Sequence, residues 1–144
     1  MIYLGADHNG FQLKQQLKKY LERKGVAYRD LGAHKLVARD DYPDFAISVA
    51  KKISGRDQGL LICGSGHGMA IAANKVAGVR AALCSSPFSA KMARRDDHAN
   101  VLVLASWETT LPQAQKIVSQ WFKSEPSKII RYVRRINKIK RLER

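Results

Sequence analysis

The residues best suited to chemistry lie in one short stretch, CGSGHG at positions 63–68. It follows an apolar run and leads into an alanine-rich segment with the composition of a helix. Gly64, Gly66 and Gly68 are spaced two apart, and backbone N–H groups freed at the start of a helix bind anions. The stretch therefore predicts a turn that can hold a phosphate or an oxyanion beside a cysteine.

Cys63 and Ser65 stand in the field of that turn. A thiol at a helix N-terminus has its pKa lowered from about 8.5 toward neutrality, which suits it to act as a base. The same N–H groups would stabilise the negative oxygen that forms when a proton leaves the carbon next to a carbonyl. The alternative is that Cys63 closes a buried strand as a small apolar residue and the glycines make a tight turn. Spacing alone leaves both interpretations open.

Two more groups could contact a small anionic ligand. Asp7 and His8 follow the first apolar run, where they could grip a phosphate or a sugar hydroxyl or form an ordinary surface pair. Arg131 and Arg135 are four residues apart on a predicted helix, so both guanidinium groups share one face and could clamp a phosphate. The alternative for the arginines is a solvated basic helix.

The motifs of nucleotide cofactors and metal sites are absent from the sequence. Met69 stands where a dinucleotide-binding turn needs glycine or alanine, and Phe11 and Gln12 stand where a P-loop needs lysine and a hydroxyl residue. Cys63 and Cys84 lack the CxxC spacing of a zinc or redox site and are expected to be thiols. We therefore expect no cofactor.

The elements that position these residues follow from the hydrophobic pattern. Five apolar runs alternate with helical patterns, and the runs are continuous rather than alternating. The predicted strands are 2–6, 26–32, 58–63, 79–84 and 100–105. This order predicts a doubly wound five-stranded parallel sheet with helices on both faces, a three-layer α/β/α fold, plus an extra C-terminal helix. Ligands of such sheets bind where the strands end and lead into helices.

Length and charge limit the remaining possibilities. The chain has 144 residues, which predicts one domain over 1–144 with a basic C-terminal helix over 126–144. There is no apolar run of membrane-spanning length and no N-terminal secretory pattern, so a cytoplasmic location is expected. The net charge is +14, and the last 22 residues carry nine Lys or Arg and only two Glu. Binding of RNA or another polyanion by this segment is an alternative function.

Six segments together resemble a known family. They are GADHNGFQLK, DDYPDFA, GLLICGSGHGMAIAANK, GVRAALCSSPFSAKMAR, ANVLVLAS and RYVRRINKI. The chain resembles the type B ribose-5-phosphate isomerases and the related allose- and galactose-6-phosphate isomerases. The resemblance implies aldose–ketose isomerisation through a cis-enediolate, with ribose 5-phosphate and the pentose phosphate pathway as the first expectation. It also implies a homodimer or homotetramer with shared active sites, and no metal.

The resemblance assigns a role to each matched residue. It implies that Cys63 moves the proton between C1 and C2, that Ser65 assists transfer between the oxygens, and that amides of the glycine turn hold the enediolate. The remaining matched residues are assigned to the substrate: Asp7 and Tyr42 to the sugar, and His8, Arg131 and Arg135 to the phosphate.

Three matched positions depart from the family pattern. Asp96 and Asp97 stand where a histidine that opens the furanose ring and a substrate-binding asparagine are usual, and Trp107 replaces a usual arginine. Asp96 could serve in ring opening as a carboxylate base. The departures leave the proton-transfer residues in place and bear on the choice of substrate. A hexose-6-phosphate isomerase and a catalytically reduced paralogue that binds polyanions are the alternatives.

Overall fold

One parallel sheet forms the centre of the molecule. The computed structural model describes residues 1–143, and Arg144 lies outside the described part. The strands are β1 (Ile2–Ala6), β2 (Tyr28–Asp30), β3 (Gln58–Cys63), β4 (Ala81–Leu83) and β5 (Val101–Ala105). The helices are α1 (Phe11–Arg23), α2 (Tyr42–Ala50), α3 (His67–Ala73), α4 (Pro87–Asp97), α5 (Leu111–Lys123) and α6 (Ile130–Arg141). The strand order is β2-β1-β3-β5-β4, and neighbouring strands run parallel.

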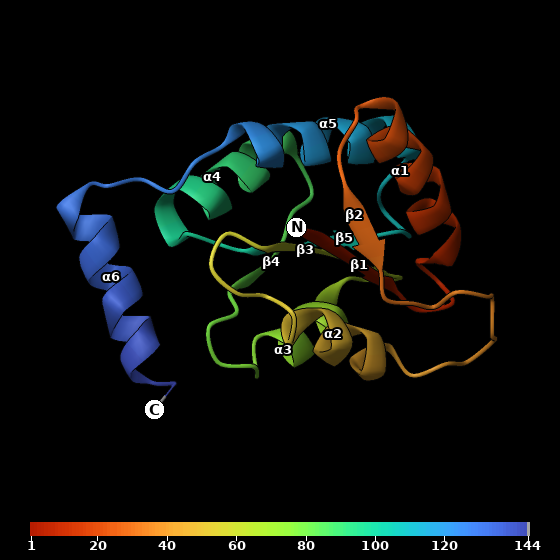
Figure 1. The fold of residues 1–144 in the computed structure, drawn as a ribbon, viewed down its shortest axis with the longest axis horizontal. Helices are drawn as coiled ribbons and strands as arrows, with labels where there is room; N and C mark the ends of the chain where they lie inside the picture. The colour runs from red at the N-terminus through yellow and green to blue at the C-terminus, as the bar shows by residue number, and fades with distance from the viewer. Residues whose placement is uncertain (144) are drawn as a thin grey trace.

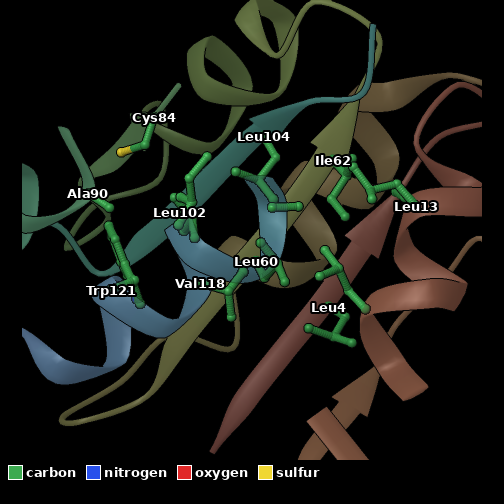
Figure 2. Close-up of a cluster of buried hydrophobic side chains, with 14 of the residues drawn as sticks. Leu4, Leu13, Leu60, Ile62, Cys84, Ala90, Leu102, Leu104, Val118 and Trp121 are labelled. Carbon is green, nitrogen blue, oxygen red and sulfur yellow. The ribbon is translucent and has the colours of Figure 1, made fainter. Parts of the chain in front are cut away.

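Helices cover both faces of this sheet, as predicted (Figure 1). On one face, apolar side chains of α1, α4 and α5 pack on the strands in one cluster, and Figure 2 shows Leu60 beside Val118 and Trp121 beside Ala90 there. On the other face, α2 and α3 bury a second cluster that includes Cys63. The predicted doubly wound, three-layer fold is confirmed.

The edge strands are shorter than the sequence pattern predicts. The runs 26–32 and 79–84 each give only three residues of strand, in β2 and β4. These two strands are the outermost ones, so each pairs on one side only. Beyond β2 the chain still follows β1, because the N–H of Leu31 donates to the Leu4 carbonyl and that of Ala33 to the Ala6 carbonyl.

The C-terminal helix begins later than predicted. Residues from Pro126 onward were expected to be helical, but α6 begins at Ile130. The Ser127 N–H donates to the Arg95 carbonyl at 2.9 Å, and the His98 ring lies 2.9 Å from the Ser127 carbonyl. These bonds tie the connecting segment to the end of α4, which delays the helix. The predicted end at Arg144 lies outside the described residues.

Helix α6 leaves much of its apolar side uncovered. It contacts α4 and extends away from the three layers (Figure 1). Ile130 is 80% exposed and Leu142 is 85% exposed, whereas Ile136 is buried. Within residues 1–143, none of the helices combines the length and the apolar character needed to cross a membrane.

Candidate active site

The glycine turn lies at the point where the chain changes sides of the sheet. Strand β1 sits between β2 and β3, so the carboxyl ends of β1 and β3 flank the crevice where doubly wound sheets bind ligands. β3 ends at Cys63 and α3 begins at His67. Gly66 has φ +80°, a left-handed conformation that favours glycine, and its N–H donates to the Cys63 sulfur at 3.2 Å. The Cys63 thiol and an amide of the glycine turn are therefore joined by a hydrogen bond.

Two aromatic rings lie against this turn. A side chain at Gly64 would overlap the indole ring of Trp107, and one at Gly68 would overlap the phenol ring of Tyr42. Both rings are largely open to solvent, with Trp107 71% and Tyr42 40% exposed. Glycine is required at both positions because the rings approach the backbone closely. The rings form walls on either side of the turn.

The prediction of a lowered Cys63 pKa is wrong in direction. Burial raises the pKa of the Cys63 thiol above its usual value, and the charge of Asp7 raises it further. Hydrogen bonds from the amides of Met69 and Gly66 act in the opposite sense but do not outweigh burial. The side chain is only 4% exposed. Cys63 therefore closes a buried strand and also contacts the amides of the turn, and its role as a base stays a prediction.

Asp7 and His8 form a polar cluster with a residue that the sequence did not single out as functional. The Asp7 carboxylate accepts a hydrogen bond from the Gly10 N–H at 3.0 Å, and burial raises the pKa of Asp7. The His8 N–H and ring Nδ1 both lie within hydrogen-bond distance of Asp40 Oδ1, at 2.9 and 2.8 Å. Sequence reasoning assigned Asp40 no function, because no local pattern links positions this far apart in the chain.

The loops after β1, β3 and β5 are bonded to one another. The Ser106 hydroxyl donates to the Asn9 carbonyl at 2.8 Å, and the Ser106 N–H donates to the Cys63 carbonyl at 2.8 Å. Trp107 donates its N–H to the Gly64 carbonyl at 3.1 Å. The loop after β5 thus fixes the position of the glycine turn relative to the loop that carries Asp7. Sequence reasoning assigned Ser106 no function.

The other predicted site residues gather around the end of α4 and the start of α6. Asp96 accepts a hydrogen bond from Arg95 at 2.6 Å, and this bond, with the nearby charges of Arg131 and Arg135, lowers the pKa of Asp96. The guanidinium groups of Arg131 and Arg135 lie over the ring of Tyr132, at 4.7 and 5.9 Å from its centroid. They do share one side of the helix, as their spacing predicts.

The residues around Cys63 lie at the carboxyl ends of the strands, and the residues around Asp97 lie at the amino ends. α4 starts after the carboxyl end of β4 and runs back, so Asp97 lies at the amino ends of the strands. There it lines a cavity of about 710 Å³ together with Val79, Arg80 and Ala81, which lead into β4. The fold therefore brings Cys63 near Tyr42, Asp7 and Trp107, at the carboxyl ends of the strands. Four predicted site residues do not lie at these ends: Asp96, Asp97, Arg131 and Arg135.

One cluster in the described chain has the composition of a metal site. Within residues 1–143, ligand atoms of Asp7, His8 and Asp40 all lie within 4.8 Å of one another. The His8 Nδ1 and Asp40 Oδ1 atoms that would bind a metal are joined by a 2.8 Å hydrogen bond. The cluster is accounted for by this bond, and the expected absence of a metal stays a prediction.

Doubly wound sheets that place a base and an anion-binding turn at the switch point are typical of enzymes acting on small polar metabolites, and this chain is of that class. The chain belongs to the ribose/galactose isomerase family, whose model matches residues 2–139. The predicted resemblance is confirmed.

Relatives of known name support this assignment. The chain is 43% identical over 122 residues to ribose-5-phosphate isomerase B of Escherichia coli, a match that covers 83% of this chain and 81% of the relative. The enzyme of the same name from Mycolicibacterium paratuberculosis is 40% identical over 145 residues, covering 99% and 91% of the two chains. A crystal structure of ribose-5-phosphate isomerase B from Mycoplasma genitalium, with bound ribulose-5-phosphate, superposes with a TM-score of 0.94 and 45% identity. The match covers 99% of this chain and 95% of the Mycoplasma genitalium chain.

Proposed function

We propose that this protein interconverts ribose 5-phosphate and ribulose 5-phosphate. The observation that carries the proposal is the Cys63 thiol at the sheet switch point, bonded to the Gly66 amide at 3.2 Å, in a chain that belongs to the isomerase family. The close structural likeness to a relative with bound ribulose-5-phosphate supports the choice of a pentose phosphate. No cofactor takes part in the proposed reaction.

Cys63 transfers the proton in this mechanism. Its thiolate takes the proton from C2 of the open-chain aldose, and the electrons of that bond form the C1–C2 double bond of a cis-enediolate. The amides of the glycine turn hold the negative oxygen, and Ser65 moves a proton between O2 and O1. Cys63 then returns its proton to C1, which yields the ketose. A base with a raised pKa is a stronger proton acceptor once it is ionised.

The phosphate and sugar contacts come from both groups of residues. Asp7 and Tyr42 contact the sugar, and His8 lies at the same edge of the sheet. The indole of Trp107 is neutral, so the positive charge for the phosphate comes from Arg131 and Arg135 on α6. Because these arginines lie near the amino ends of the strands in their own chain, they bind the phosphate in the site of a second copy of the chain.

A homodimer completes the site in this proposal. The uncovered apolar side of α6 packs on the partner and carries the two arginines to the partner's Cys63 turn. Asp96 and Asp97 follow with the end of α4. Asp96 holds the arginines through charge, and its lowered pKa makes it a weak base. Its ring-opening role and the substrate contact of Asp97 stay predictions.

Isotope exchange tests the reaction. Incubation with ribose 5-phosphate in deuterated water is expected to give ribulose 5-phosphate carrying deuterium at C1, as seen by proton NMR. Allose 6-phosphate is expected to react more slowly, because the two aromatic walls of the turn leave less room for a longer sugar. Faster exchange with a hexose phosphate would instead identify a hexose-6-phosphate isomerase. No exchange with either class of sugar phosphate contradicts the proposal.

Mixing two inactive variants tests the shared site. In a dimer of Cys63→Ala with the double variant Arg131→Ala/Arg135→Ala, one of the two sites keeps both the thiol and the arginines. Random reassociation after mild unfolding is therefore expected to restore about a quarter of the original activity. A mixture of Cys63→Ala with Ser65→Ala is the matched control, since these residues belong to the same turn and no intact site can form. Equal recovery in both mixtures would overturn the shared site.

A further inference from the structure

Asp40 is bonded to His8 twice. Asp40 Oδ1 accepts the His8 backbone N–H at 2.9 Å, and the His8 ring atom Nδ1 lies 2.8 Å from the same oxygen. The Asp40 side chain is 10% exposed, and the His8 side chain is 29% exposed. One oxygen thus fixes both the backbone and the ring of His8, so the ring has one preferred orientation.

This geometry determines which ring nitrogen faces outward. An ionised carboxylate only accepts hydrogen bonds, so Nδ1 must carry the proton in the bond to Asp40. The other nitrogen, Nε2, remains for a ligand. When both ring nitrogens are protonated, Nε2 donates a hydrogen bond with positive charge. A phosphate needs such a donor, because its oxygens are acceptors.

The loop that carries Asp40 is held in place by the fold. The segment 31–33 is hydrogen bonded to β1, and the buried Lys14 donates to the Ala33 carbonyl at 2.6 Å. Arg39, directly before Asp40, has φ +61°, a conformation that costs about 1 kcal/mol or more for a residue other than glycine. The chain therefore accepts an unfavourable backbone geometry at the residue that precedes Asp40.

The second carboxylate oxygen of Asp40 is buried and has no hydrogen-bond partner among residues 1–143. Within residues 1–143, the Asp40 side chain therefore forms hydrogen bonds to His8 alone. Buried polar atoms are nearly always paired, so retaining a half-unpaired carboxylate here carries a cost in stability. A functional reason for the residue is consistent with that cost.

We infer that Asp40 is a positioning residue, which holds His8 by its backbone N–H and by Nδ1 and so directs Nε2 toward the phosphate of the substrate. The inference rests on the proposed function for its substrate, and the contact between Asp40 and His8 can be measured without it. Asp40 itself does not touch the sugar phosphate. It acts through the orientation of the His8 ring.

Nitrogen NMR of the His8 ring tests the positioning directly. In the unchanged protein, Nδ1 is expected to carry the proton, with ring resonances assigned by comparison with His8→Ala. Asp40→Ala is expected to shift these resonances toward those of a free histidine. Asp40→Asn keeps an acceptor oxygen and removes the charge, so it is expected to retain the protonated Nδ1 and to shift the ring resonances less than Asp40→Ala does. Unchanged His8 resonances in Asp40→Ala would overturn the inference.

Phosphate affinity and kinetics provide the functional readout. Asp40→Ala is expected to weaken the binding of inorganic phosphate, measured by calorimetry, about tenfold, and to raise KM for ribose 5-phosphate by a similar factor, with kcat within about twofold. Asp40→Asn should lie between. Asp41→Asn is the matched control, because it removes the same charge from the exposed neighbouring residue and leaves His8 untouched. Equal losses in Asp41→Asn and Asp40→Asn, or no loss in Asp40→Ala, contradict the inference.

The two readouts separate this inference from the proposed reaction. If the protein does not isomerise any sugar phosphate, the NMR and phosphate-binding results still decide the role of Asp40. Should Asp40→Ala fail to fold, Asp40→Asn replaces it, because a neutral amide oxygen is a weaker acceptor for the His8 N–H groups than a carboxylate oxygen. An Asn variant with the original phosphate affinity and unchanged His8 ring resonances would then overturn the inference.

Discussion

Cys63→Ala is expected to lower kcat for ribose 5-phosphate by about a hundredfold to ten-thousandfold, the range by which general bases accelerate reactions. The physical reason is that the thiolate alone receives the carbon-bound proton, whereas the contacts to the sugar and the phosphate remain. KM is therefore expected to change little. Initial rates and deuterium incorporation at C1 measure the effect. A variant with full activity would contradict the assignment of Cys63 as the base.

Cys84→Ala is the matched control for this change. Cys84 also ends a strand run and is 1% exposed, but it lies in the cluster under α4 and α5, on the other face of the sheet. Both substitutions remove one buried sulfur and are expected to cost about 1 kcal/mol of unfolding free energy. Only Cys63→Ala should affect catalysis. Equal kcat losses in the two variants would show that packing rather than base chemistry is responsible.

The raised pKa of Cys63 gives this expectation a pH signature. Because burial holds the thiol in its neutral form, the thiolate fraction grows as pH rises toward the shifted pKa. The kcat/KM of the unchanged enzyme is therefore expected to increase from about pH 7 to about pH 9. A profile that falls over this interval would argue against a cysteine base with a raised pKa.

Lys14→Ala is expected to have the largest effect on stability, a loss of about 3 kcal/mol of unfolding free energy. Lys14 is fully buried, and its ammonium donates to Asp30 and to the Ala33 carbonyl, both at 2.6 Å. Removing it leaves a cavity and takes a donor from the partly buried carboxylate of Asp30. Urea denaturation at neutral pH measures the loss. A change below about 0.5 kcal/mol would contradict the expected role.

Lys18→Ala provides the comparison. Lys18 pairs with the other oxygen of Asp30 at 2.8 Å but is 23% exposed, so water screens the pair. Its removal is expected to cost less than about 1 kcal/mol. Lys14→Met, which fills the space without the charge, should recover part of the loss through packing. If Lys18→Ala were as damaging as Lys14→Ala, burial would not be the deciding factor.

Much of the fold follows from local sequence patterns. Continuous apolar runs separated by helical patterns predicted five parallel strands with helices on both faces, and this is confirmed. Ser86 and Pro87 are a local signal of the same kind: they stand at the start of α4, where the Ser86 hydroxyl accepts the Ser89 N–H. Such signals depend on neighbours within a few residues, which is why they can be read without the fold.

The pattern was less reliable where tertiary contacts compete with local preference. The edge strands are shorter than their apolar runs, because each lacks a pairing partner on one side. The C-terminal helix starts at Ile130 because bonds of Ser127 to the end of α4 hold the preceding residues in an extended form. In both cases the presence or absence of a contact with a distant segment decides the boundary.

The sequence by itself determined the residue types at the site: a cysteine at a glycine turn, an Asp-His pair after β1 and two arginines on one side of a helix. Only the tertiary structure decided what surrounds them. It placed Asp40 on His8 and Trp107 on Gly64, separated the arginines from Cys63, and raised the thiol pKa that the helix terminus alone was expected to lower. The reason is that spacing along a helix or turn is set by adjacent residues, whereas burial and charge neighbours are set by segments far apart in the chain.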